Sequence, residues 1–186
     1  MALGMVLDPT ATRDDDIAGP GADAGVLVGK RIGIRVDQIW RAWDWISELW
    51  ADKFRAAGAS VSFWRSCGRS GDEGERMEGE LEEFLSTVDI AIVGLANCGS
   101  CTGWTVRDAI TAANAGLPTT AIATANFESF ARTMAARGGR SGLRVCVLPY
   151  PLNELSRDQV IAIGEAHFRS LLDAMGARLA MKANAA

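Results

Sequence analysis

The stretch DIAIVGLANCGSCTGWTVRDAITAANAG, residues 89–116, places two different patterns on either side of one short loop. Residues 89–96 form an almost unbroken apolar run, which is typical of a strand buried on both faces of a parallel sheet. Residues 104–116 have the apolar spacing of a helix. Between them, Cys98 and Cys101 stand among small residues. The stretch therefore predicts one strand–loop–helix step of an α/β fold, with two cysteines in its loop.

The same alternation continues on both sides of this stretch. Further strands are expected at residues 30–37, 59–66, 117–125 and 143–151, and further helices at 38–58, 75–88, 126–139 and 156–176. Such alternation predicts a parallel sheet with helices on both faces. Five strands in one short chain favour the α/β, flavodoxin-like doubly wound order 2-1-3-4-5. We expect a single α/β domain over residues 25–180, after a flexible leader over 1–24 that is rich in Asp, Gly, Ala and Pro.

The first long helix, at 38–58, has more tryptophan than its core stripe needs. Residues at helical 3–4 spacing predict this stripe: Ile39, Trp43, Ile46, Trp50 and Phe54. Trp40 and Trp45 fall outside it, so they either cover a second part of the core or form a subunit interface. Because tryptophan is favoured at the centre of interfaces, we expect a homo- or hetero-oligomer.

Composition excludes several classes of protein. The chain has 186 residues, of which 48% are hydrophobic, and this is enough for one packed core. The net charge of −4 and the lack of a basic block give no footprint for nucleic acid. No apolar run reaches the ~20 residues of a membrane span, and the start MALGMVLDPT does not resemble a secretory signal. We therefore expect no membrane partner and a cytoplasmic, reducing location, where a CxxC pair suggests chemistry more than a permanent staple.

The predicted topology also gives a position for the chemistry. In the order 2-1-3-4-5 a ligand binds at the carboxyl ends of strands 1 and 3, and the cysteine loop follows strand 3. The helix that starts there favours a thiolate and can bind an anion. The residues expected to surround a small-molecule substrate are Asp37, Gln38, Asn97, Gly99, Ser100, Thr102, Thr124 and Asn126. Thr102, Asn126 and Ser156 are the expected N-caps of their helices.

Cys98 and Cys101 are the predicted catalytic residues. Cys98 lies in the open loop and is expected to attack, while Cys101 lies nearer the helix and is expected to resolve the adduct. A structural metal needs about four ligands, and Cys67, Cys146 and His167 do not converge on a second pair, so we expect no metal. No GxGxxG run is present, and we expect no cofactor.

The segments VGLANCGSCTGWTVRDAITAANAGLPTTAIATANF and RVCVLPYPLNELS resemble the UGSC family. That family is named for a selenocysteine-Gly-Ser-Cys motif, in which many members carry cysteine first. Here the motif is Cys98-Gly99-Ser100-Cys101, and Trp104 and Asp108 also match. The resemblance implies a thiol/disulfide-oxidoreductase-like protein in which residue 98 is a nucleophile or redox centre.

A more distant resemblance is to the aspartate/glutamate racemase group. Those proteins abstract protons with cysteines and no cofactor, but they place one cysteine on each side of the substrate, whereas Cys98 and Cys101 share a loop.

Three functions are therefore expected. The first is a cysteine-dependent thiol/disulfide redox enzyme that acts on a small molecule and is reset by a thiol reductant. The second is a cofactor-free cysteine lyase or transferase acting on a small carboxylate. The third is a non-catalytic subunit of a heteromeric complex.

Overall fold

Five parallel strands form the central sheet of the computed structural model, which describes residues 14–67, 69 and 71–179. They are β2 (Arg31–Asp37), β3 (Ser60–Ser66), β4 (Ile90–Ala96), β5 (Thr119–Thr124) and β6 (Arg144–Leu148). Their spatial order is β3-β2-β4-β5-β6. Counted along these five strands alone, this is the predicted order 2-1-3-4-5. The short pair of β1 (Gly25–Val26) and β7 (Ala177–Arg178) forms a separate two-stranded sheet that the sequence did not predict.

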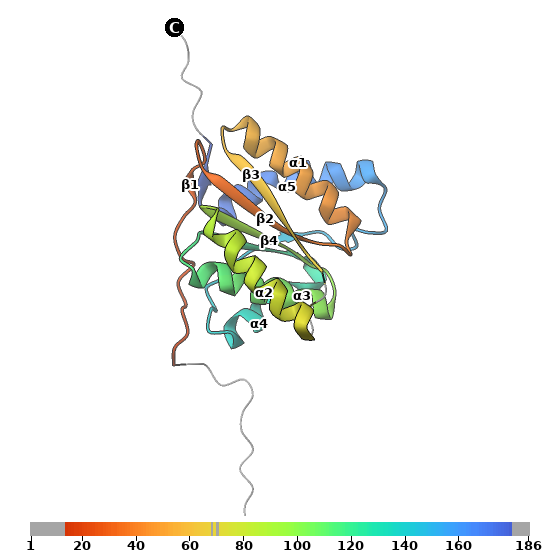
Figure 1. Cartoon of the computed structure of the whole chain (residues 1–186). Coiled ribbons are helices and arrows are strands. Elements are labelled where there is room, and N and C mark those ends of the chain that lie inside the picture. The colour runs from red at the N-terminus through yellow and green to blue at the C-terminus, as the bar shows by residue number, and fades with distance from the viewer. Residues whose placement is uncertain (1–13, 68, 70, 180–186) are drawn as a thin grey trace, which may run out of the picture.

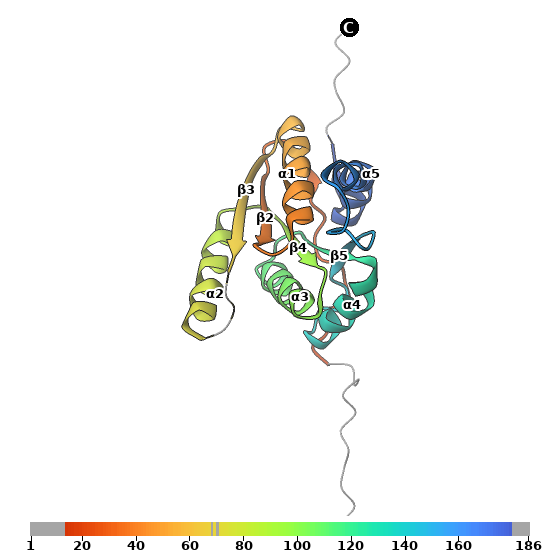
Figure 2. The same cartoon turned by 90° about the vertical axis from the view of Figure 1, so that its right-hand side faces the viewer.

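Helices cover both faces of this sheet, as a doubly wound fold requires. One face carries α1 (Arg41–Ala56) and α5 (Arg157–Met175); the other carries α2 (Gly71–Ser86), α3 (Gly99–Asn114) and α4 (Glu128–Arg137). A 3-10 turn, Ala125–Phe127, precedes α4. Figures 1 and 2 show these two helical layers with the sheet between them. Each layer has its own cluster of buried apolar side chains against the sheet.

The apolar stripe of α1 is confirmed except at its first member. Trp43, Ile46, Trp50 and Phe54 have no exposed surface, whereas Ile39 is 65% exposed. The reason is that the helix begins only at Arg41. Before it, the Asp37 carboxylate accepts hydrogen bonds from the backbone N–H groups of residues 39 and 40, and this turns the chain outside the helix.

The two additional tryptophans of this region, Trp40 and Trp45, pack against the core of their own chain. Both are partly buried and contact the apolar cluster between α1, α5 and the sheet. The contact gives them a role within the domain. Their predicted role in a subunit interface stays a prediction.

Of the three predicted N-caps, only Ser156 is confirmed. Its side chain caps α5 in a capping box. The prediction for Thr102 was wrong, because α3 begins at Gly99, five residues before the predicted start. Cys98 occupies the N-cap position. The prediction for Asn126 was also wrong, because this residue lies inside the 3-10 turn that precedes α4.

The predicted leader, residues 1–24, falls partly outside the described residues. From residue 14 onward the chain runs along the domain. The N–H of Ile17 donates to the carbonyl oxygen of Gly139 at 2.9 Å, and Arg144 forms an ion pair with Asp23 at 2.6 Å. Within the part of the chain that the structure describes, none of the helices combines the length and the apolar character that crossing a membrane would require.

Candidate functional site

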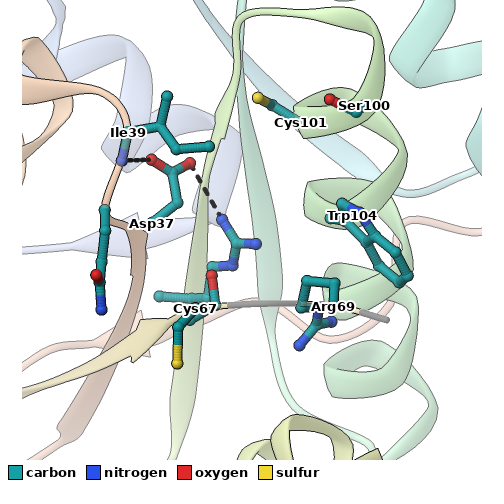
Figure 3. A pocket seen from close by; sticks show the side chains of 10 residues that line it. Asp37, Ile39, Cys67, Arg69, Ser100, Cys101 and Trp104 are labelled. Carbon is teal, nitrogen blue, oxygen red and sulfur yellow. Dashed lines mark hydrogen bonds and ion pairs between the residues drawn. The ribbon is translucent and has the colours of Figure 1, made fainter. Parts of the chain in front are cut away.

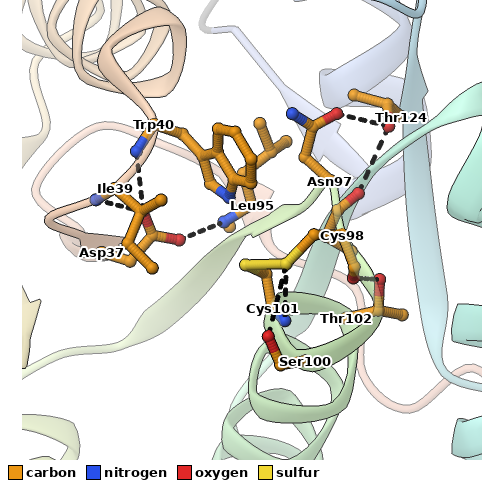
Figure 4. The surroundings of a disulfide bond; sticks show 12 residues. Asp37, Ile39, Trp40, Leu95, Asn97, Cys98, Ser100, Cys101, Thr102 and Thr124 are labelled. Carbon is orange, nitrogen blue, oxygen red and sulfur yellow. Dashed lines mark hydrogen bonds between the residues drawn. A yellow bond between two sulfur atoms is a disulfide. The ribbon is translucent and has the colours of Figure 1, made fainter. Parts of the chain in front are cut away.

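A disulfide between Cys98 and Cys101 lies at the carboxyl end of β4, where α3 begins (Figure 4). Their Cα atoms are 5.1 Å apart. The Sγ of Cys98 accepts a hydrogen bond from the N–H of Cys101 at 3.1 Å, so the sulfur also caps the helix. Cys101 is 7% exposed and Cys98 is more open. The predicted pair therefore meets at the predicted edge of the sheet.

Three of the predicted substrate-binding residues support this loop from behind. Asn97, Thr102 and Thr124 are buried. The hydroxyl of Thr124 donates to Asn97 Oδ1 at 2.9 Å, and that of Thr102 donates to the Cys98 carbonyl oxygen at 2.6 Å. These bonds fix the end of β4 against β5 and the first turn of α3. None of the three lines the cavity beside the disulfide.

That cavity has a volume of about 430 Å³ and opens beside Cys101 (Figure 3). Its lining residues are Arg35, Asp37, Gln38, Ile39, Ser66, Cys67, Arg69, Ser100, Cys101 and Trp104. Asp37, Gln38, Ser100 and Cys101 were predicted at the site. Gly99 and Asn126 are exposed and are not among the lining residues.

Behind the cavity lies a buried group of charges that the sequence did not reveal as a unit. Asp108 is 1% exposed and Arg35 is 3% exposed. Asp108 Oδ2 accepts from Arg35 Nε at 3.0 Å, and its other oxygen accepts from Arg69 Nη2. Burial raises the pKa of Asp108, while the two guanidinium groups act in the opposite direction. The carboxylate joins α3 to β2 and to the segment that follows β3.

Asp37 is held by the backbone around it. Its carboxylate accepts N–H groups from Ile39 at 3.0 Å, Trp40 at 3.2 Å and Leu95 at 3.4 Å. Arg35 Nη1 lies 3.4 Å from it and donates to the Gly94 carbonyl oxygen at 2.8 Å. Asp37 therefore fixes the ends of β2 and β4 relative to each other, and its carboxylate has little capacity left to act as a base.

Arg69 differs from the other charged residues of the site because its hydrogen-bonding capacity is only partly used. Its guanidinium carbon lies 4.9 Å from the ring centre of Trp104 and 5.7 Å from that of Trp64. Nη2 binds Asp108, but Nε and Nη1 are buried without a partner among the described residues. Arg65, which lies on β3, pairs with Asp44 at 2.8 Å on the surface and does not line the cavity.

The remaining cysteines and the histidine have separate surroundings. Cys67 is exposed and lines the cavity. Cys146 is buried in β6, and burial raises its pKa to about 12. His167 lies on α5, where its Nδ1 is 2.9 Å from the Ile163 carbonyl oxygen. Among residues 14–67, 69 and 71–179, no three His, Cys, Asp or Glu side chains are placed to hold a metal ion.

Comparison with known families decides where the chain belongs. The sequence profile of the UGSC family matches residues 5–177. This chain is a member of the UGSC family. No protein of curated function matches it.

Among solved structures, the UGSC chain is similar to two mutants of the flavo di-iron protein from Thermotoga maritima. Their TM-scores are 0.45 and 0.44, with 10% and 9% identity. The matches cover 81% and 83% of this chain and 37% of each of those chains, so this chain spans little more than a third of their length.

Proposed function

We propose that this UGSC protein is a cysteine-dependent thiol/disulfide oxidoreductase that acts on a small molecule. The observation that carries the proposal is the Cys98–Cys101 disulfide at the start of α3, beside a cavity of about 430 Å³. The carboxyl ends of parallel strands at a reversal of strand order are where doubly wound folds bind ligands. A reducible pair in that position can exchange electrons with a bound molecule.

The proposed reaction is a two-step thiol–disulfide exchange. In the reduced enzyme, the Cys98 thiolate attacks one sulfur of a disulfide substrate, forms a mixed disulfide and releases the first substrate thiolate. The Cys101 thiolate then attacks Cys98 Sγ, forms the Cys98–Cys101 disulfide and releases the second. Two electrons pass from the cysteine pair to the substrate. The two released thiolates take up protons from the solvent, which received two protons when the enzyme thiols ionised. An external thiol or dithiol reduces the pair again, in the reducing compartment that the sequence suggests.

The surroundings of Cys98 support its role as the attacking residue. It is more open than Cys101, and its Sγ accepts the Cys101 N–H at 3.1 Å. A helix N-terminus carries a partial positive charge of roughly half a unit, which stabilises a thiolate and lowers its pKa. Cys101 lies within disulfide distance of Cys98, which is what a resolving residue needs. Cys101 lines the cavity and Cys98 does not, so the substrate disulfide would have to reach Cys98 past Cys101, at the rim of the cavity. Asn97, Thr102 and Thr124 hold the backbone on either side of Cys98 in place.

Trapping experiments test this assignment directly. Cys101→Ser should accumulate a mixed disulfide between residue 98 and a small disulfide probe, detected by intact-mass spectrometry. Cys98→Ser should form far less adduct, and Cys67→Ser, the matched control at the cavity wall, should still cycle. In the wild type, redox titration should show a reversible two-electron couple between residues 98 and 101. Failure to reduce and re-form this disulfide reversibly would remove the basis of the proposal.

One observation favours a second candidate, the cofactor-free lyase acting on a small carboxylate. Cys67 follows β3 and Cys101 belongs to α3, yet both line the same cavity. With both thiols reduced, one thiolate can remove the proton at the carbon next to the carboxylate, and the other thiol can protonate the group that leaves from the neighbouring carbon, which together make an elimination. This reaction would exchange substrate hydrogen for deuterium in D₂O without consuming reductant, and it would depend on Cys67. The redox reaction would show neither property.

A further inference from the structure

Arg69 is a buried cation with unused hydrogen-bond donors. Its side chain is only 7% exposed, and Nη2 donates to Asp108. Nε and Nη1 together carry three N–H groups. These two nitrogens have no hydrogen-bond partner within the described part of the chain. Buried donors in proteins are almost always paired, so this guanidinium is expected to bind an acceptor that the described residues do not supply.

The position of Arg69 shows where this acceptor would come from. The residue lines the same cavity as Ser100, Cys101 and Trp104 (Figure 3). Its guanidinium carbon lies 4.9 Å from the Trp104 ring centre, and this contact holds the cation at the cavity wall. A ligand in the cavity is therefore the group best placed to meet the free N–H groups.

The local charges favour an anion. The two carboxylates of the site are already engaged: Asp108 by Arg35 and Arg69, and Asp37 by backbone N–H groups and Arg35. Neither is placed on the free nitrogens of Arg69. The positive end of α3 reaches the cavity at Ser100. Its field adds to that of the arginine.

Helical geometry sets the distance between this anion site and the disulfide. Cys101, Trp104 and Asp108 are three and four residues apart along α3, so they lie on one face of the helix. At 1.5 Å per residue, Trp104 lies about 4.5 Å and Asp108 about 10 Å along the axis from Cys101. An anionic group at Arg69 would thus be separated from the reacting sulfurs by a few bonds of a small molecule.

We propose that Arg69 binds the carboxylate of the substrate, and that the substrates of this protein are small disulfides that carry a carboxylate a few bonds from sulfur. The inference rests on the proposed redox function and specifies its substrate. A carboxylate is favoured over a larger oxyanion because one guanidinium supplies the free donors, and the aromatic wall at Trp104 leaves the rest of the cavity partly apolar. The carboxylate accepts from Arg69 while the disulfide meets the cysteine pair.

The test compares three probes that differ in one group. These are dithiodipropionate, a carboxylate; dithiodiethanesulfonate, a sulfonate; and hydroxyethyl disulfide, which is neutral. For the wild type, kcat/KM for the carboxylate should exceed that for the neutral probe by at least about tenfold, the factor given by 1.4 kcal/mol of added transition-state binding. Arg69→Met should abolish this preference, so that the ratio of kcat/KM for the carboxylate probe to that for the neutral probe falls to about one. Arg65→Met removes an exposed arginine that does not line the cavity, and it should change neither value.

The outcomes separate this inference from the proposed function. If hydroxyethyl disulfide is reduced as fast as the carboxylate probe, the anion site is refuted while the redox function stands. If none of the probes is reduced, the redox function itself fails. A preference for the sulfonate overturns the carboxylate assignment, and an equal loss for all probes in Arg69→Met shows a purely structural arginine. Should Arg69→Met not fold, the wild-type ratio alone and Arg69→Lys decide, because lysine keeps the charge but not the array of donors.

Discussion

Replacing Asp108 with asparagine should destabilise the protein strongly, although the two side chains have nearly the same shape. Asp108 is 1% exposed, and its carboxylate binds Arg35 Nε at 3.0 Å and Arg69 Nη2. The amide would leave two buried guanidinium groups without this negative charge. Removing one partner of a buried ion pair costs about 3–5 kcal/mol. For a chain of this size that corresponds to a fall in Tm of roughly 6–20 °C.

Urea denaturation at neutral pH, followed by tryptophan fluorescence, measures the change in the free energy of unfolding. The matched control is Asp52→Asn. Asp52 pairs with Arg55 at 2.9 Å, but its side chain is 78% exposed. An exposed pair of this kind is worth about 1 kcal/mol or less. The two substitutions are chemically identical, so the difference between them isolates the effect of burial.

If Asp108→Asn lowers the free energy of unfolding by less than about 1 kcal/mol, the reasoning is refuted, because a buried charge that has lost its partner should destabilise the protein by more than that. A double variant gives an independent check. Adding Arg69→Met to Asp108→Asn removes one of the uncompensated cations, so it should recover part of the lost stability. If the two losses simply add, the ion pair does not couple these residues in the way their contact indicates.

Three further predictions concern packing, reactivity and pH. Gly94→Ala should lower the free energy of unfolding by about 1–3 kcal/mol, because the added methyl carbon would lie 2.6 Å from the buried indole of Trp43. Gly79→Ala should raise it by up to about 1 kcal/mol, because residue 79 has open space around it inside helix α2. Chemical denaturation measures both changes. Cys146, whose pKa is raised to about 12 by burial, should resist iodoacetamide at pH 8 until the protein unfolds, as mass spectrometry will show. The hydrogen bonds and charge of Arg31 lower the pKa of Asp89 to about 2. The ion pair therefore stabilises the folded protein fully above the usual carboxyl pKa near 4, and this stabilisation is lost as the pH falls toward 2. The difference in Tm between the wild type and Asp89→Asn should shrink over that interval.

The sheet and its order could be predicted because its strands are strongly marked. Residues 90–96 are all buried, and their apolar run could belong only to a central strand. The pair β1 and β7 could not be predicted, because two residues per strand carry no periodicity. The start of α3 was placed too late because Gly99 and Gly103 are poor helix formers, and the cap that offsets this is a cysteine sulfur, which is not among the usual capping groups.

The CxxC pair was a clear signal in the sequence, but the arginines beside it were not. Arg35 stands on β2 two residues before Asp37, on the face of the strand opposite Ile34. A charge between the apolar residues Ile34 and Val36 is the one sign of its role that the sequence carries. Arg69 had no such sign, because it follows β3 in a charged, glycine-rich segment where arginine is usually solvated. Only its contacts distinguish it, and two of the three residues it contacts, Trp104 and Asp108, come from a distant part of the chain.

The two sides of the site follow strands that differ in how well they tolerate changes of sequence. The disulfide follows β4, which has a neighbouring strand on each side and lies deep in the sheet. Arg69 and Cys67 follow β3, which stands at the edge and pairs with β2 alone. A change of length or sequence after an edge strand disturbs few neighbours. Under the proposed function, changes in the segment after β3 would alter which molecules are accepted, while the cysteine pair stays fixed by the centre of the sheet.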